Sequence, residues 1–221
     1  MTERNLRKER ELMRREENKK FILEAAERIF AKKGYRQATV DDIAHEVQFS
    51  KATIYRYFMS KSAIFSEIIM SSFLEARENF LRIRRRQESA ENKLKRLIHF
   101  VLSFYHQKKD IARVLLMERS AMKRILQIDM GNHVVPLHGK KGIPDDYKRI
   151  VHQIFDIMCE VIQEGIDSGE FRKMDVRDAC YVLGSLLRGF HFRGPVHKKD
   201  YTIDESTELV HAFFTNGIKR Q

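Results

Sequence analysis

The chain has 221 residues, of which 43% are hydrophobic and 33% are charged, and its formal net charge at pH 7 is +11. This length suits one large domain or two small ones. The basic balance favours an acidic partner such as nucleic acid, although lysine-rich solvated helix faces would give the same charge. No apolar run approaches the roughly 18 residues of a membrane span, and the N-terminus lacks the apolar core of a signal peptide. We therefore expect a cytoplasmic protein without a membrane partner.

Residues 1–17 form a net-basic arm with almost no apolar periodicity. The arm is either a disordered tail or a helical extension held by pairs four residues apart, such as Glu11 with Arg15. In the first case it is idle; in a DNA-binding protein it would add phosphate or minor-groove contacts.

A helical pattern begins at Asn18. Its apolar positions recur at steps of three and four residues, namely Phe21, Ile22, Ala25, Ala26, Ile29 and Phe30. Lys32 and Lys33 place cations at the negative end of this helix, and Gly34 is available for a left-handed cap. We predict one helix that ends near Gly34 and is followed by a short linker.

The segment from Thr39 to Lys61 reads TVDDIAHEVQFSKATIYRYFMSK. Thr39 is an N-cap for a short helix over Val40–Val47, and Ser50 is an N-cap for a second helix from Lys51 to about Phe58. Two short helices joined by a tight turn indicate a helix-turn-helix.

The second of these helices carries the chemistry that suits a polyanion. Ile54 and Phe58 are spaced to pack inward. The outward face has no acid and presents Lys51, Ala52, Thr53, Tyr55, Arg56 and Tyr57. We predict that Lys51, Ala52 and Tyr55 face the major groove. The predicted contacts to the DNA backbone are Thr39, Thr53, Tyr57 and Lys61.

The run from Phe21 to Ile69, with AAERIFAKKGYRQATVDDIA followed by FSKATIYRYFMSKSAIF, resembles the DNA-binding domain of the TetR family of bacterial transcriptional regulators (TetR/AcrR type). The matching positions are Ala25, Phe30, Gly34, Thr39, Ile43, Ala44, Ser50, Thr53, Tyr55, Tyr57, Phe58 and Lys61. Phe49 departs from the aliphatic residue usual before the serine, and we interpret it as a larger core plug. The resemblance covers about the first third of the chain.

On this basis residues 18–66 form the helix-turn-helix DNA-binding domain and residues 67–221 a C-terminal ligand-sensing and dimerisation domain. Ser60 caps a long helix that begins at Lys61 and runs for about 25 residues, roughly 37 Å. The resemblance implies that this helix acts as a lever between the two parts. Arginines 82, 84, 85 and 86 at its far end indicate a solvated helix end, and the alternative is a second contact with an anion.

The C-terminal part shows further helical patterns and no persistent strand alternation. Residues 128–144, rich in glycine and proline, indicate a loop or flap. Cys159 and Cys180 lie in apolar helical contexts, which predicts reduced thiols. We predict an all-α protein of about nine helices, with a three-helix N-terminal helix-turn-helix domain and a larger C-terminal helical domain.

The last two helices are apolar on more than one stripe, which favours a two-fold dimer through a four-helix bundle, as the resemblance also implies. The predicted interface residues are Leu186, Leu187, Phe190, Phe213 and Phe214. The alternative is that they complete an intramolecular core. A dimer would match half-sites about 34 Å apart.

A ligand cavity between the central helices is implied by the resemblance. Its candidate lining is Phe100, Phe104, Tyr105, Met117, Met122, Phe155, Met158 and Leu183. The same residues would fill an ordinary core. Arg113, Arg188 and Arg193 are candidates to pair with an anionic effector such as a fatty acyl thioester, and surface solvation is the alternative for each.

Scattered histidines, such as His133, His138, His191 and His197, show no metal-ligand spacing, and no phosphate loop or nucleophile elbow is present. We predict no metal, no cofactor and no enzymatic activity. The predicted function is a homodimeric regulator that binds operator DNA, most simply as a repressor released by a small apolar or acyl-type effector. The alternatives are a ligand-binding helical scaffold and a non-specific nucleic-acid-binding protein.

Overall fold

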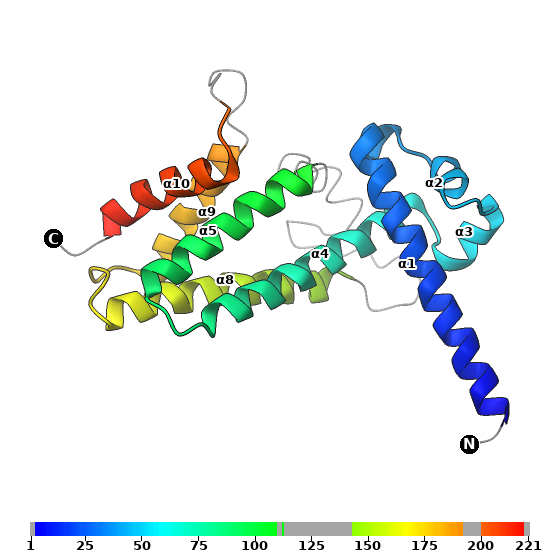
Figure 1. Ribbon diagram of the computed structural model, residues 1–221, viewed down its shortest axis with the longest axis horizontal. Helices are drawn as coiled ribbons and strands as arrows, with labels where there is room; N and C mark the ends of the chain where they lie inside the picture. Colours follow the sequence, from blue (N-terminus) through cyan, green and yellow to red (C-terminus); the bar gives the residue numbers. More distant parts are fainter. Residues whose placement is uncertain (1–2, 110–111, 113–142, 192–199, 219–221) are drawn as a thin grey trace. The chain divides into compact units, whose positions relative to one another are not determined.

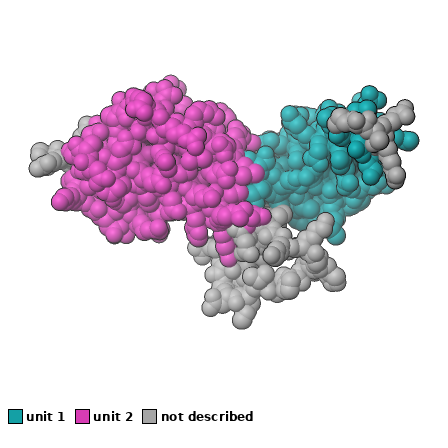
Figure 2. Space-filling view, turned by 90° about the horizontal axis from the view of Figure 1, so that it is seen from below, with its two compact units in different colours: residues 1–71, 113–144 teal, residues 72–112, 145–221 magenta. Residues whose placement is uncertain are grey.

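A computed structural model describes residues 3–109, 112, 143–191 and 200–218. Within these ranges the regular elements are eight α-helices (Figure 1), which confirms the all-α prediction of about nine helices. The chain divides into two compact units, shown in different colours in Figure 2: the first reaches Ser71, and the second runs from Ser72 to Ala112 and again from Asp145. None of the described helices has the length and apolar character needed to cross a membrane.

The first unit contains α1 (Glu3–Gln37), α2 (Val40–Glu46), α3 (Lys51–Tyr57) and the first turns of α4 (Lys61–Arg84). Helix α1 is interrupted at Gly34, whose φ of 73° favours glycine because a side chain would be strained there. Most of the predicted arm is helical, since α1 begins at Glu3. The arm is therefore a helical extension of α1 and not a disordered tail.

The core of the first unit joins all four helices. The Phe30 and Phe65 rings meet edge to face with centroids 5.2 Å apart, and Tyr35 lies 4.5 Å from Phe65. Ile43 of α2 and Ile54 of α3 are fully buried beside them. Because α2 and α3 are too short to be stable alone, this packing holds them in place.

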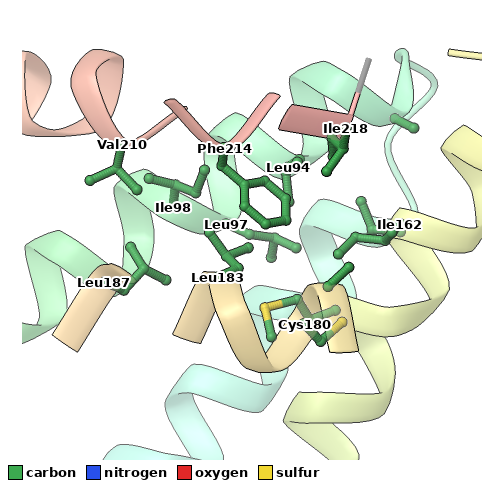
Figure 3. Packing of buried hydrophobic residues seen from close by; sticks show 14 of the residues in the cluster. Leu94, Leu97, Ile98, Ile162, Cys180, Leu183, Leu187, Val210, Phe214 and Ile218 are labelled. Carbon is green, nitrogen blue, oxygen red and sulfur yellow. The ribbon is translucent and has the colours of Figure 1, made fainter. Parts of the chain in front are cut away.

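The second unit contains the rest of α4 with α5 (Ala90–Gln107), α8 (Ile143–Asp167), α9 (Val176–His191) and α10 (Ile203–Ile218). Figure 3 shows the side chains of these helices converging on one apolar core. The labelled residues are Leu94, Leu97, Ile98, Ile162, Cys180, Leu183, Leu187, Val210, Phe214 and Ile218. The loop predicted over residues 128–144 lies almost wholly outside the described residues.

Cys159 and Cys180 are both free thiols, with their sulfur atoms 3.0 Å apart between α8 and α9. Burial raises the pKa of both thiols above its ordinary value. Because the thiolate is the reactive form, both sulfurs are expected to react slowly in the folded chain.

Candidate DNA-binding surface

Helices α2 and α3 form the helix-turn-helix, which we call the reading pair. The N-terminus of α2 is closed by two reciprocal hydrogen bonds between Thr39 and Asp42. The Asp42 amide donates to Thr39 Oγ1 at 3.1 Å, and the Thr39 amide donates to Asp42 Oδ2 at 2.9 Å. Lys33 Nζ adds an ion pair with Asp42 Oδ1 at 2.6 Å. The hydrogen bonds that the Asp42 carboxylate accepts from Lys33 and from the backbone and side chain of Thr39 lower its pKa from 3.8 to about 2. The entry into α2 is thus fixed by the N-cap that the sequence predicts.

The turn into α3 has a second fixed start. Gln48 takes a positive φ of 54°, and the Phe49 amide donates to the Ala44 carbonyl at 2.9 Å. Ser50 Oγ then accepts from the Thr53 amide at 3.0 Å, as predicted for an N-cap. The half-buried ring of Phe49 meets Phe21 of α1 edge to face at 6.4 Å, so it packs between the reading pair and α1.

The face of α3 that the sequence assigns to DNA is open. Ile54 and Phe58 are buried. Lys51, Ala52, Tyr55 and Arg56 are exposed, while Thr53 and Tyr57 are half-buried, and Thr39 at the start of α2 is exposed. Because the inward anchors and the N-cap both fix α3, its outward side chains are displayed from a rigid helix. This is the arrangement that a recognition helix needs.

An acid adjoins this face, which the sequence alone did not indicate. Lys51 Nζ donates to Asp41 Oδ2 at 2.7 Å, across the turn between α2 and α3. That hydrogen bond raises the pKa of Lys51. The carboxylate therefore holds the lysine in one orientation and offsets part of its charge.

Lys61, which the sequence predicts to contact a DNA phosphate, forms hydrogen bonds within the first unit. Its ammonium donates to the carbonyl oxygens of Tyr35 and Ala38, each at 2.8 Å, and of Arg36 at 3.3 Å. The same nitrogen lies 4.6 Å from the centre of the Tyr35 ring. Desolvation lowers the pKa of Lys61. In the structure this lysine joins α4 to the linker between α1 and α2, because the end of α1 leaves carbonyls without helical partners.

Tyr57 connects α3 with α1. Asn18 Nδ2 donates to the Tyr57 hydroxyl oxygen at 3.1 Å, which leaves the hydroxyl proton available as a donor. Lys19, the next residue, forms an ion pair with Glu67 of α4. The sequence suggested no partner for Asn18, since the contact joins residues 39 positions apart.

In the second unit, the candidate ligand residues occupy α5, α8 and α9. Leu183 and Met158 are buried in the core, and the side chains of Phe100, Tyr105 and Phe155 pack against it partly buried. The Phe100 and Phe104 rings stack with centroids 6.4 Å apart. Met117 and Met122 lie outside the described residues. The described members thus belong to the core or pack against it, Phe104 through the ring of Phe100.

Two aromatic residues that the sequence analysis missed extend this group. Tyr147 of α8 packs edge to face on Phe73 of α4 with centroids 5.1 Å apart, and burial raises the pKa of Tyr147 to about 12. Burial also raises the pKa of Tyr105, while the charge of Arg188 opposes the shift. Tyr147 lies three and seven residues before Ile150 and Ile154, so the apolar repeat of α8 was the signal that pointed to it.

The predicted dimer residues divide between the surface and the core. Phe213 is 73% exposed, and Leu186 is exposed on α9. Leu187 and Phe214 are only 3% and 4% exposed. These two residues lie in the core of the subunit and not on its surface, as an interface position would require. They follow Leu183 and Val210 by four residues, which turns them to the inner face.

Between α9 and α10 lies an open apolar hollow of about 530 Å³. It is lined by Tyr181, Val182, Ser185, Leu186, Gly189, Phe190, Leu209, Val210 and Phe213. Tyr181 and Val182 are exposed and were not in the predicted interface, because they precede the most apolar part of α9.

For metal binding, the described part of the chain contains no group of three or more His, Cys, Asp or Glu residues that could hold an ion. His191 of α9 instead packs against Tyr105 with ring centroids 5.3 Å apart. His133, His138 and His197 lie outside the described ranges, as do Arg113 and Arg193.

Known proteins match both parts of the chain. Residues 22–68 match the family model described as bacterial regulatory proteins, tetR family, and residues 136–214 match the C-terminal region of QacR-like proteins. The HTH-type transcriptional regulator YvkB of Bacillus subtilis is 31% identical over 209 residues, covering 90% of this chain and 96% of YvkB.

Two solved structures share the fold. A transcriptional regulator from Saccharomonospora viridis in complex with choline has a TM-score of 0.74 at 23% identity, covering 93% of this chain and all of that one. FadR from Bacillus subtilis in complex with stearoyl-CoA has a TM-score of 0.66 at 21% identity, covering 90% and 98%. These two structures show the shared fold. The family match over residues 22–68 and the relationship to YvkB identify the chain as a member of the tetR family, a DNA-binding transcriptional regulator and not an enzyme.

Proposed function

We propose that the chain is a homodimeric repressor that reads operator DNA through α3 and leaves it when an apolar or acyl-type effector binds the second unit. The observation that carries the proposal is the open face of α3, with Lys51, Ala52 and Tyr55 exposed on a helix anchored by Ile54. Repression is the simpler sense, because a protein that occupies a promoter needs no further partner.

The dimer is supported by the apolar surface of α9 and α10. Tyr181, Val182, Leu186 and Phe213 are large exposed side chains beside one hollow. A contiguous apolar patch of this kind marks an interaction site in a soluble protein. A second copy related by a two-fold axis would cover it and form a four-helix bundle with the first. The two copies would then present two α3 helices to successive major grooves.

The effector site is supported by the aromatic group of the second unit. Phe100, Phe104 and Phe155 offer apolar surface, and Arg188, whose charge acts on Tyr105, offers a cation for an acidic head group. Of the two ligands in the related structures, this chemistry resembles the needs of stearoyl-CoA more than those of choline. We therefore propose an acyl thioester as the effector.

Coupling between the sites needs two conformations of different affinity. Helix α4 is one continuous helix with residues in both units, so a tilt imposed on its distal turns would move its first turns beside α3. An effector releases DNA only if it binds the conformation that cannot hold DNA more tightly than the conformation that can.

The proposal is tested by selecting duplexes from a random pool with the full-length protein in the presence of competitor DNA. We expect an enriched inverted repeat that binds at physiological salt and is released by stearoyl-CoA but not by choline. A scaffold protein would enrich no duplex. A non-specific binder would show a steep salt dependence without sequence preference.

A further inference from the structure

A polar cleft lies where the N-terminal extension of α1 passes the end of α3, and Figure 1 shows this part of α1 continuing beyond α3. The cleft measures about 570 Å³. It is lined by Glu11, Arg14, Arg15, Asn18, Arg56 and Tyr57, all within the first unit. Arg56 and Tyr57 also belong to the outward face of α3, whereas the other four lining residues lie on α1 and have no part in the DNA contacts of α3 or in the effector site.

The base of the extension is fixed against the reading pair. Asn18 donates to the Tyr57 hydroxyl at 3.1 Å. On the next residue, the Lys19 ammonium pairs with Glu67 and lies 6.0 Å from the centre of the Phe58 ring. These contacts join α1 to α3 and α4 at the floor of the cleft. The arginines one turn earlier are therefore held beside α3 by a continuous helix.

The cleft carries uncompensated positive charge. Arg14, Arg15 and Arg56 are exposed, and none of the three forms an ion pair with another described residue. Against three guanidinium groups the lining contains a single carboxylate, that of Glu11. An arginine cluster without acidic partners suits an anion, and the guanidinium fork matches phosphate oxygens.

The side of α1 that faces the cleft carries further arginine. At 100° per residue, Arg7 and Arg14 fall on the same side of α1 as Asn18, together with Glu11, whereas Glu9 and Glu16 fall on the opposite side. Arg7 lies about 10 Å further along the helix than Arg14, at 1.5 Å per residue. Arginine thus recurs on this side of α1 outward from the cleft, with Glu11 between the two positions.

We propose that this cleft binds a phosphate group of the DNA backbone next to the segment that α3 reads, so that the α1 extension is a second DNA contact. The inference rests on the proposed function, because Arg56 and Tyr57 belong to both α3 and the cleft. A polyanion lying against the exposed face of α3 passes its C-terminal end, where the cleft opens. Phosphate contacts of this kind add affinity and register without sequence preference.

The test uses full-length dimer and the duplex enriched by the wild-type protein, titrated between 50 and 200 mM salt. The variant is Arg14→Ala with Arg15→Ala. The control is Lys20→Ala with Lys173→Ala, which removes the same charge from an exposed site on the far side of α1 and from the second unit. Arg14→Lys with Arg15→Lys restores the charge. Far-UV circular dichroism checks that α1 stays helical.

We expect the arginine variant to bind roughly ten-fold more weakly, with a salt slope smaller by about one and the same enriched sequence, while the control binds like wild type and the lysine pair recovers most of the slope. Ethylation-interference mapping of the wild type and of the arginine variant gives a second reading, on the DNA side of the contact. We expect it to locate a backbone phosphate outside the major-groove contacts that matters to the wild type and not to the arginine variant.

The results separate the two claims. If the wild-type protein enriches no duplex, the proposed function fails and this inference fails with it. If the wild type binds its duplex but the arginine variant matches the control, and no additional phosphate is found, only the second contact is overturned. A variant that enriches a different sequence would show that the extension reads bases, which also overturns a phosphate role.

Discussion

The ammonium of Lys61 donates to the carbonyl oxygen of Tyr35 at 2.8 Å and packs over the ring of the same residue at 4.6 Å. With the bonds to Arg36 and Ala38, this lysine closes the end of α1 against the start of α4. A residue that looks like a phosphate contact in the sequence thus stabilises the frame that holds α2 and α3.

Replacing Lys61 with methionine keeps the aliphatic stem and removes three donors. We expect the free energy of unfolding to fall by about 1 kcal/mol, because the partly buried carbonyls of Tyr35 and Ala38 lose their donor. Urea denaturation followed by circular dichroism measures the change, with the exposed Lys20→Met as a matched control. Unchanged stability together with lost duplex binding would show that Lys61 acts on DNA instead.

The ion pair between Lys51 and Asp41 leads to a second prediction. Asp41→Asn removes a negative charge 2.7 Å from the lysine and beside the expected path of the DNA. We expect duplex affinity to rise several-fold and the salt slope to increase by about one, because the carboxylate no longer repels the DNA phosphates or offsets the charge of Lys51. Fluorescence anisotropy titrations check this, with Asp204→Asn in the second unit as the charge-matched control. A fall in affinity would mean that Asp41 orients Lys51 for base contact.

Asp42 predicts a pH dependence. Its pKa is lowered from 3.8 to about 2 in the folded chain, so its contribution to stability is complete above 3.8 and is lost as pH falls toward 2. Wild type is expected to be more stable than Asp42→Asn near neutral pH, and the difference between them to close below about pH 4. Thermal melts of both proteins from pH 2 to 7 measure it. A difference that persists to pH 2 would contradict the assignment.

Phe213 tests the proposed dimer. Phe213→Glu puts a charge on a side chain that is 73% exposed, so the subunit fold tolerates it, but a dimer interface at α9 and α10 does not. We expect monomers by light scattering, with dimer dissociation raised at least about 100-fold. Met59→Glu, at a side chain 91% exposed in the first unit, serves as control. A Phe213→Glu protein that remains dimeric would place the interface elsewhere.

Local sequence signals predicted much of the first unit. Thr39 and Ser50 are N-caps as expected, and α2 and α3 begin at the predicted residues because each cap acts within three residues of itself. Lys61 begins a helix of 24 residues against about 25 predicted. The apolar repeat of α4, which sets its length, is also local information.

Contacts between distant residues were beyond the sequence. Asp41 lies in the first turn of α2, and only the turn geometry brings it to Lys51. Asn18 and Tyr57 meet across 39 positions. Leu187 and Phe214 looked like interface residues because both outer and inner stripes of their helices are apolar, and composition does not say which stripe faces the core.

The most direct test of the central claim is the affinity of Tyr55→Ala for the enriched duplex at fixed salt. Tyr55 is 47% exposed on the outward face of α3, away from the buried anchors Ile54 and Phe58. If α3 reads DNA, the variant stays a folded dimer and binds about 1 to 3 kcal/mol more weakly. Binding equal to wild type would contradict the assignment of this face to DNA.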